Sequence, residues 1–120
     1  MASGLTDQEV QARIDAGQVL YQAQNCGGCH GSDGTGASLG GSIVVGVVSA
    51  AGSLGGCSDT HCSSYDAMVS VIGNGIANTL MPACTATSSD PECATKIADY
   101  VWAELNKANG YTLTADGGTK

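Results

Sequence analysis

Two cysteines and a histidine in the N-terminal part of the chain have the spacing of a haem-attachment site. The stretch is Cys26-Gly27-Gly28-Cys29-His30, with two residues between the thiols and the imidazole directly after the second. In such a site each thiol adds across one haem vinyl group, and the histidine supplies an axial nitrogen to the iron. A Cys-x-x-Cys pair without this histidine would fit a redox disulfide or half of a zinc site equally well. The spacing therefore predicts one covalently bound haem c, with His30 as an iron ligand.

Four further cysteines remain once the haem-attachment pair is set aside. An even remainder in a small domain predicts two disulfides and an oxidising compartment. Four cysteines can pair in three ways, and the sequence does not choose among them. We prefer the two local pairs, Cys57–Cys62 with four residues between the thiols and Cys84–Cys93 with eight.

His61 lies beside Cys62 and suggests a metal site with the two thiols of that loop. Such a site would supply three ligands where structural zinc takes four, and zinc thiolates are disfavoured in an oxidising compartment. We therefore expect a solvated loop histidine and keep zinc binding as the alternative.

Composition and charge narrow the classes of function. Aromatic residues make up only 4% of the 120 residues, Phe is absent and 18 residues are Gly, so large apolar side chains are scarce and a buried porphyrin would supply the missing apolar body. The formal net charge is −7 with four basic residues, which makes nucleic acid and anionic membranes poor partners. No apolar run approaches the length of a transmembrane helix.

Three helices are expected to position the candidate site. The first spans Thr6 to about Gln24, with Thr6 and Glu9 in a capping box. Gly17 lies on its apolar face one turn before Tyr21, so we expect another helix to approach closely there. The second spans about Ser64 to Ile72, and the third spans about Pro91 to Lys107 after Asp90 as N-cap.

The segments between and after these helices are less regular. Residues 32–56 are rich in Gly, Ser and Ala around the apolar run 43–48, which we expect to line the haem, with a short helical turn or an exposed docking patch as alternatives. Pro82 lacks an amide proton and stiffens the loop after Met81, which would hold a thioether in one place. Residues 108–120 are expected to form a tail or linker.

The order of these parts resembles class I c-type cytochromes over about residues 5–107. The resemblance rests on a first helix ending in Cys-x-x-Cys-His, then Gly73-Asn74-Gly75, then Met81-Pro82, and a last helix carrying residues 97–102. It implies an all-α, small cytochrome c fold in a single domain (1–120), with three main helices and irregular loops around one haem and with two extra disulfides. In that family the first and last helices cross, with a small residue such as Gly17 near an aromatic such as Tyr100.

The resemblance also assigns the ligands. It implies that Cys26 and Cys29 hold the haem, that His30 is the proximal ligand and that Met81 is the distal sulfur ligand. Met68 lies at a core position of the middle helix, where packing is its expected role. His61 and an open or water-bound iron remain the alternatives to Met81. The chain departs from the common pattern in its four extra cysteines, in its long Gly-rich segment and in its lack of a lysine-rich rim, which puts an acidic docking partner in doubt.

We therefore expect a non-enzymatic electron carrier cycling between Fe(II) and Fe(III), since two filled axial positions leave no place for substrate. The alternative is a haem peroxidase or gas-ligand sensor with an open distal side. We expect a monomer, periplasmic or secreted, that docks through its haem edge on a partner with a basic or neutral patch. It could be a free carrier or the cytochrome domain of a larger secreted redox protein serving a copper or quinone enzyme. The chain begins Met1-Ala2-Ser3-Gly4 without a signal segment, so we expect an export signal to have been removed or replaced.

Overall fold

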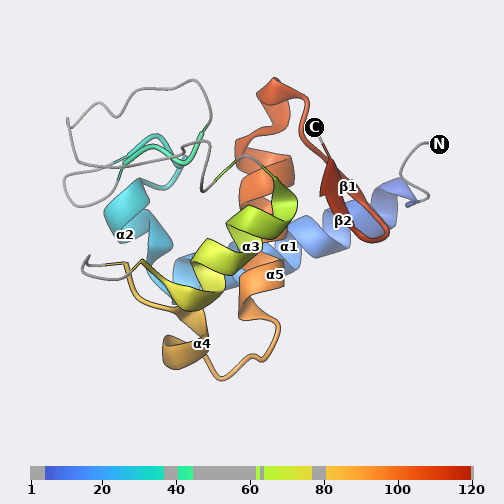
Figure 1. Ribbon diagram of the computed structural model, residues 1–120. Coiled ribbons are helices and arrows are strands. Elements are labelled where there is room, and N and C mark those ends of the chain that lie inside the picture. Colours follow the sequence, from blue (N-terminus) through green and yellow to red (C-terminus); the bar gives the residue numbers. More distant parts are fainter. Residues whose placement is uncertain (1–4, 37–40, 45–61, 63, 77–80, 120) are drawn as a thin grey trace.

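The structure is a computed structural model that describes residues 5–36, 41–44, 62, 64–76 and 81–119. Its helices and two short strands follow one another along the chain as Figure 1 labels them. The elements are α1 (Asp7–Ala23), α2 (Cys26–His30), α3 (Tyr65–Asn74), α4 (Cys84–Thr87), α5 (Cys93–Tyr100), a π-helical turn (Val101–Leu105), a 3-10 turn (Lys107–Asn109), β1 (Thr112–Thr114) and β2 (Gly117–Thr119).

Helix α1 begins at the predicted capping box. The Thr6 hydroxyl accepts from the Glu9 amide at 3.1 Å, and the Glu9 carboxylate accepts from the Thr6 amide at 3.0 Å. Its buried residues are Ile14, Gly17 and Tyr21, which share one face. The predicted helix and its inward face are both confirmed.

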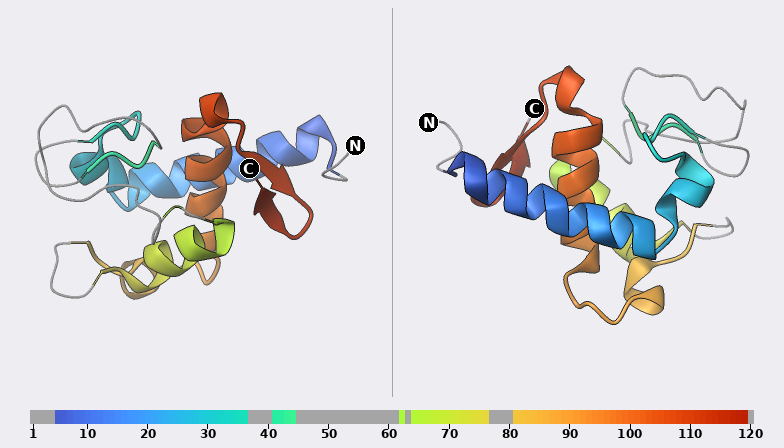
Figure 2. Two further views of the ribbon diagram at one scale, coloured as in Figure 1. Left: turned by 45° about the horizontal axis from the view of Figure 1, so that its top comes forward. Right: turned by 180° about the vertical axis from the view of Figure 1, so that it is seen from behind.

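The crossing of α1 and α5 occurs at Gly17, as the sequence indicated. A Cβ atom at Gly17 would lie 2.7 Å from the Tyr100 Cβ and would overlap the Lys96 carbonyl oxygen. The rings of Tyr21 and Tyr100 flank the crossing with their centroids 5.2 Å apart. Figure 2 shows α1 running across α5. Only glycine permits this approach of the two helices.

The prediction of one regular helix from about Pro91 to Lys107 is wrong. The chain is α-helical only from Cys93 to Tyr100 and then widens into a π-helical turn. Asn106 closes this turn: it is fully buried, and its backbone and side-chain amides both donate to the Val101 carbonyl, at 3.1 and 3.0 Å. Asp90 accepts from the Glu92 amide at 2.8 Å, so it shapes the turn before the helix, whose N-cap residue is Glu92.

The expectation of a tail or linker after residue 107 is wrong for residues 111–119, and the helix-rich fold that was expected ends in a short hairpin. Strands β1 and β2 form an antiparallel hairpin in which Leu113 pairs with Gly118. Leu113 is 2% exposed, and Tyr111 is buried as well. The Trp102 indole N–H donates to the Thr112 carbonyl at 3.0 Å and to the Thr119 carbonyl at 3.2 Å. The hairpin is thus part of the packed fold.

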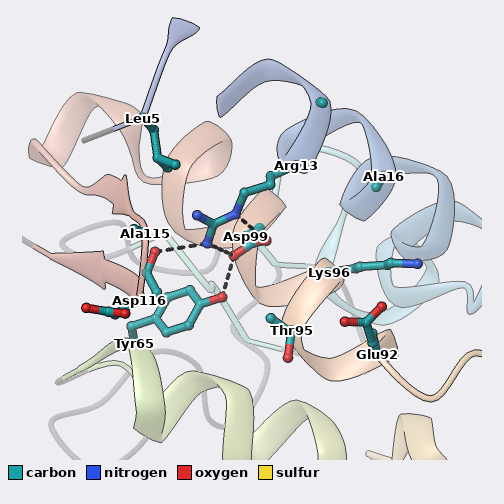
Figure 3. A pocket seen from close by; sticks show the side chains of 12 residues that line it. Leu5, Arg13, Ala16, Tyr65, Glu92, Thr95, Lys96, Asp99, Ala115 and Asp116 are labelled. Atoms are coloured by element: carbon teal, nitrogen blue, oxygen red, sulfur yellow. Dashed lines mark hydrogen bonds and ion pairs between the residues drawn. The ribbon is translucent and has the colours of Figure 1, made fainter. Parts of the chain in front are cut away.

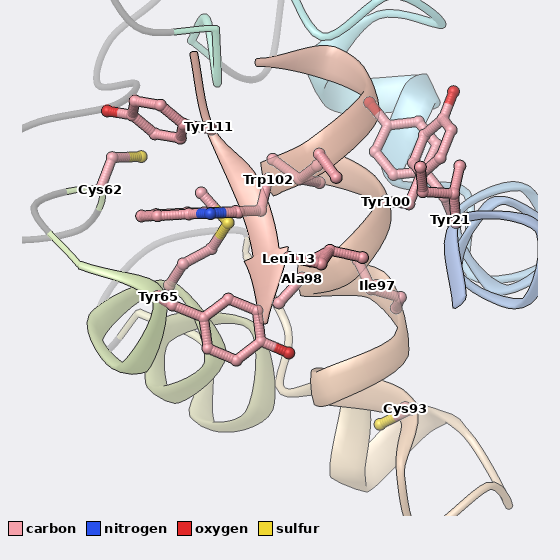
Figure 4. Packing of buried hydrophobic residues seen from close by; sticks show 14 of the residues in the cluster. Tyr21, Cys62, Tyr65, Cys93, Ile97, Ala98, Tyr100, Trp102, Tyr111 and Leu113 are labelled. Atoms are coloured by element: carbon pink, nitrogen blue, oxygen red, sulfur yellow. The ribbon is translucent and has the colours of Figure 1, made fainter. Parts of the chain in front are cut away.

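The buried apolar side chains form one cluster between α1, α3, α5 and the hairpin. Its centre is Trp102, whose ring lies between Tyr65 and Tyr111 with centroid distances of 5.8 and 4.3 Å (Figure 4). Met68 is 3% exposed within the same cluster, which confirms its predicted packing role. Within the ranges that the structure describes, no helix is long and apolar enough to span a membrane.

Candidate haem site

Helix α2 places the two thiols of the haem-attachment stretch on one helical turn. Asn25 adopts a left-handed conformation (φ 57°) that separates α2 from α1. Asn tolerates this conformation better than most residues. Cys26 and Cys29 are three residues apart on this turn, so both thiols lie on the same side. Both thiols are free and half-buried, as attachment to a single porphyrin requires.

The turn is held by contacts with its neighbours on both sides. The Tyr21 hydroxyl donates to the Gly31 carbonyl at 2.7 Å, which ties the end of α2 to α1. The Gly36 amide donates to the His30 carbonyl at 2.7 Å. The carboxamide of Asn25 folds back over Gly28, where a Cβ would lie 2.5 Å from its nitrogen.

The imidazole of His30 is oriented by a backbone group. Its Nδ1 lies 2.8 Å from the Gly41 carbonyl oxygen. With the proton on Nδ1, that nitrogen donates to Gly41 and leaves Nε2 with a free lone pair for a metal. Such a bond to the second ring nitrogen also orients the ring and raises its basicity as a ligand.

The loop that carries Gly41 is itself anchored in the core. The Ile43 amide donates to the Gly34 carbonyl at 2.7 Å, and the Ile43 carbonyl accepts from the Asn106 side chain at 2.9 Å. Gly41 could not be predicted from the sequence, because a backbone acceptor has no side-chain signature. Of the apolar run 43–48, the last four residues lie outside the described ranges, so its expected role as a haem lining or docking patch stays a prediction.

Burial keeps the Cys26 thiol neutral. Burial raises the pKa of the Cys26 thiol to about 11. Catalytic Cys-x-x-Cys sites do the opposite and stabilise a thiolate near neutral pH. A neutral, half-buried thiol next to a positioned imidazole fits covalent attachment to a cofactor.

Met81 lies in the segment that returns from α3. Its carbonyl accepts from the Ile76 amide at 3.3 Å, and its side chain is half-buried. Gly75 (φ 69°) lies directly against the backbone of residues 81–83, where a Cβ would come within 2.8 Å of the Ala83 nitrogen. The backbone position of Met81 is therefore fixed against the end of α3, while its role as distal ligand stays a prediction.

The remaining cysteines differ in what the structure describes. Cys84 and Cys93 form a disulfide with a Cα–Cα distance of 6.2 Å, one of the two local pairs that we preferred. Cys62 is buried and disulfide-bonded, whereas Cys57 and His61 lie outside the described residues. The residues that are described contain no group of three or more His, Cys, Asp or Glu side chains arranged to hold a metal ion. The alternative of zinc at His61 is therefore not tested.

A polar cluster on another face of the molecule is explained by the fold. Arg13 donates to both carboxylate oxygens of Asp99, at 3.0 and 2.9 Å (Figure 3). It also donates to the carbonyls of Thr114 and Gly117. The Tyr65 hydroxyl donates to the same Asp99 carboxylate. These groups line a hollow between α1, α5 and the hairpin, and their charges satisfy one another. We assign this cluster to anchoring the hairpin.

Comparison with known proteins decides the family. Residues 12–101 match the family described as cytochrome C oxidase, cbb3-type, subunit III. The chain belongs to this family of c-type cytochrome domains. The match spans the haem-attachment turn, Met81 and most of the two crossing helices, and it ends before the hairpin. No curated protein and no solved structure matched the chain.

Membership in this family means that the cytochrome domain binds haem c covalently and that its chemistry is haem-based electron transfer. The geometry fits this group. Two free thiols lie on one helical turn, and the adjacent imidazole has one nitrogen held and the other available.

Proposed function

We propose that this cytochrome domain carries a single haem c, attached through Cys26 and Cys29, with His30 and Met81 as its axial ligands. The observation that carries the proposal is the α2 turn, in which two free thiols are followed directly by an imidazole held at Nδ1 by the Gly41 carbonyl. Each residue type matches the step it would perform: thiols for thioether bonds, and a neutral imidazole for iron.

The haem supplies one-electron chemistry by cycling between Fe(II) and Fe(III). His30 would hold the iron from one side with its orientation fixed by Gly41. The Met81 thioether favours the ferrous state and raises the reduction potential relative to a second imidazole. With both axial positions filled by protein, the domain transfers electrons and has no position for a substrate, so we propose that it is not an enzyme.

We also propose a periplasmic or secreted location, because disulfides persist in oxidising compartments and the described chain contains Cys84–Cys93. The partner would be a redox protein, such as a copper or quinone enzyme, that docks as a transient contact at the haem edge. An excess of acidic residues, with net charge −7, favours a basic or neutral docking patch on that partner. The domain would act as a monomer, as a free carrier or as part of a longer redox protein.

A visible absorption spectrum of the purified holoprotein, oxidised and then reduced with dithionite, tests this function. We expect sharp low-spin bands on reduction and the weak far-red sulfur-to-iron band in the oxidised form. Met81→Leu should abolish the far-red band, because leucine keeps the volume and removes the sulfur. Met68→Leu is the matched control and should leave the band intact, since Met68 is buried in the core.

Two results would contradict the proposal. A high-spin ferric spectrum would indicate an open iron position and favour the peroxidase or gas-ligand sensor. Low-spin bands without the far-red band would show that a residue other than Met81 is the distal ligand, and His61 would be the next candidate.

A further inference from the structure

The segment from Met81 to Cys84, called here the Met81 segment, is covalently joined to helix α5. Met81 precedes Cys84 by three residues, and Cys84 is bonded to Cys93, the first residue of α5. Three residues span at most about 11 Å, so the bridge limits how far Met81 can move. Both cysteines are buried, at 5% and 0% exposure, so the bridge lies inside the fold.

The first turn of α5, to which Cys93 belongs, packs closely against two other helices. Lys96, less than one turn later, places its carbonyl against Gly17 of α1 at the helix crossing. Ala94, beside the bridge, has its Cβ 3.2 Å from the position of a Cβ at Gly73 of α3. The bridge thus connects Met81 to the point where α1, α3 and α5 meet.

Single hydrogen bonds also join this segment to α3. The Thr85 hydroxyl donates to the Gly73 carbonyl at 2.8 Å, and the Ile76 amide donates to the Met81 carbonyl at 3.3 Å. Helix α4 has only four residues, too few to be stable in isolation. The ion pair of Lys96 with Asp90 lies near the surface, where such pairs contribute little. A covalent bond to a rigid helix is a stronger restraint than any one of these.

We propose that the Cys84–Cys93 disulfide is a positioning element for the Met81 thioether, which keeps that sulfur on the iron and excludes external ligands from its position. This inference rests on the proposed His30/Met81 ligation. The disulfide does not contact the iron. It acts by restricting the conformations that the Met81 segment can adopt once the sulfur leaves the metal.

The test compares the holoprotein with the double variant Cys84→Ala/Cys93→Ala, which leaves no free thiol in the segment. Imidazole serves as the external ligand, and its affinity for the ferric protein is measured by absorbance. Apparent affinity scales with the fraction of molecules whose iron position is open. We expect the double variant to bind imidazole about tenfold more tightly and its far-red band to disappear at a lower temperature than that of the wild type.

Leu113→Ala is the control for a general loss of stability. Leu113 is 2% exposed in the hairpin, and removing its side chain destabilises the fold without altering the Met81 segment. It should leave imidazole affinity unchanged. Equal affinity in the double variant and the wild type, with the far-red band intact, would overturn the positioning role and leave the proposed function standing. Absence of the far-red band from the wild type would instead contradict Met81 ligation itself.

Hydrogen exchange gives a second readout, which does not depend on how well the double variant folds. In Met81→Leu the sulfur–iron bond is absent while the disulfide remains. The Ile76 amide, which bonds to the carbonyl of residue 81, should then stay protected if the disulfide holds the segment. Free exchange of this amide in Met81→Leu would show that the iron bond, and not the bridge, positions the segment.

Discussion

At the scale of single residues, His30 and Cys26 show how one short stretch can be specific for its cofactor. The imidazole is oriented by a carbonyl eleven positions further along the chain. Burial raises the pKa of the Cys26 thiol to about 11. A redox-active thiol pair would need a stabilised thiolate instead. The raised pKa is consistent with cofactor attachment, and the positioned imidazole after the second cysteine is what favours haem over a redox pair.

Gly17 is the residue on which the helix crossing depends. Replacing it by valine would drive a side chain into the Lys96 carbonyl and the Tyr100 Cβ. We expect Gly17→Val to lower the free energy of unfolding by at least about 2 kcal/mol, because backbone atoms cannot move aside as a flexible side chain can. Urea unfolding followed by circular dichroism measures this change.

The neighbouring exposed residue Gln18 provides the control for this prediction. Gln18→Val introduces the same β-branched side chain on the outer face of α1 and should change stability by only about 0.5 kcal/mol. Similar losses for the two variants would show that helix propensity, and not the crossing, accounts for the effect at Gly17.

At the scale of elements, the local patterns predicted the three main helices and did not predict the short helix α4, the π-helical end of the last helix or the hairpin. The cap and the buried face of helix α1 are set by residues within about twenty positions, so spacing located them. The partner that meets Gly17, Tyr100 on the last helix, was instead implied by the resemblance to c-type cytochromes. Helix α3 similarly begins after Ser64, whose hydroxyl accepts from the Ala67 amide at 3.1 Å. The hairpin has strands of three residues with mostly Thr and Gly, a composition typical of loops.

What stabilises the hairpin comes from distant parts of the chain. The Arg13 guanidinium donates to the Thr114 and Gly117 carbonyls across more than one hundred residues of sequence. The Trp102 indole N–H donates to a backbone carbonyl in each of the two strands. No periodicity within residues 108–120 could reveal these partners. The Gly41 carbonyl beside His30 was missed for the same reason, since its contact depends on the path of a loop.

Gly118 tests whether the hairpin is integral to the core. A Cβ at this position would lie 2.7 Å from ring atoms of both Trp102 and Tyr65. Gly118→Val should therefore lift β2 from the aromatic rings and lower the free energy of unfolding by about 1–3 kcal/mol. Because Trp102 is the single tryptophan, quenching of its fluorescence by acrylamide should also increase.

Thr112→Val is the matched change on the exposed side of the same hairpin. It should leave both stability and quenching close to wild type. If Gly118→Val behaved like this control, the hairpin would not contribute to the packing of Trp102.

At the scale of the whole molecule, the charge determines how reagents approach. The formal net charge is −7, and the propionates of a bound haem would add further negative charge. The field of such a molecule reaches about 30 Å at 10 mM salt and about 8 Å at 150 mM. Small redox reagents of opposite charge should therefore respond to salt in opposite ways.

We expect this difference in the oxidation of the ferrous holoprotein by two inorganic oxidants. The second-order rate constant with anionic ferricyanide should rise between 10 and 150 mM salt, because screening removes repulsion from the acidic surface. The rate constant with a cationic cobalt(III) complex should fall over the same range, by up to about tenfold. Stopped-flow absorbance at the haem bands measures both, and using two oxidants on one protein cancels any effect of salt on the haem itself. If ferricyanide slowed with added salt while the cobalt complex accelerated, electrons would leave through a locally basic patch, and the net charge would not predict the docking surface. The expected signs would instead support a partner that presents a basic or neutral patch to the haem edge.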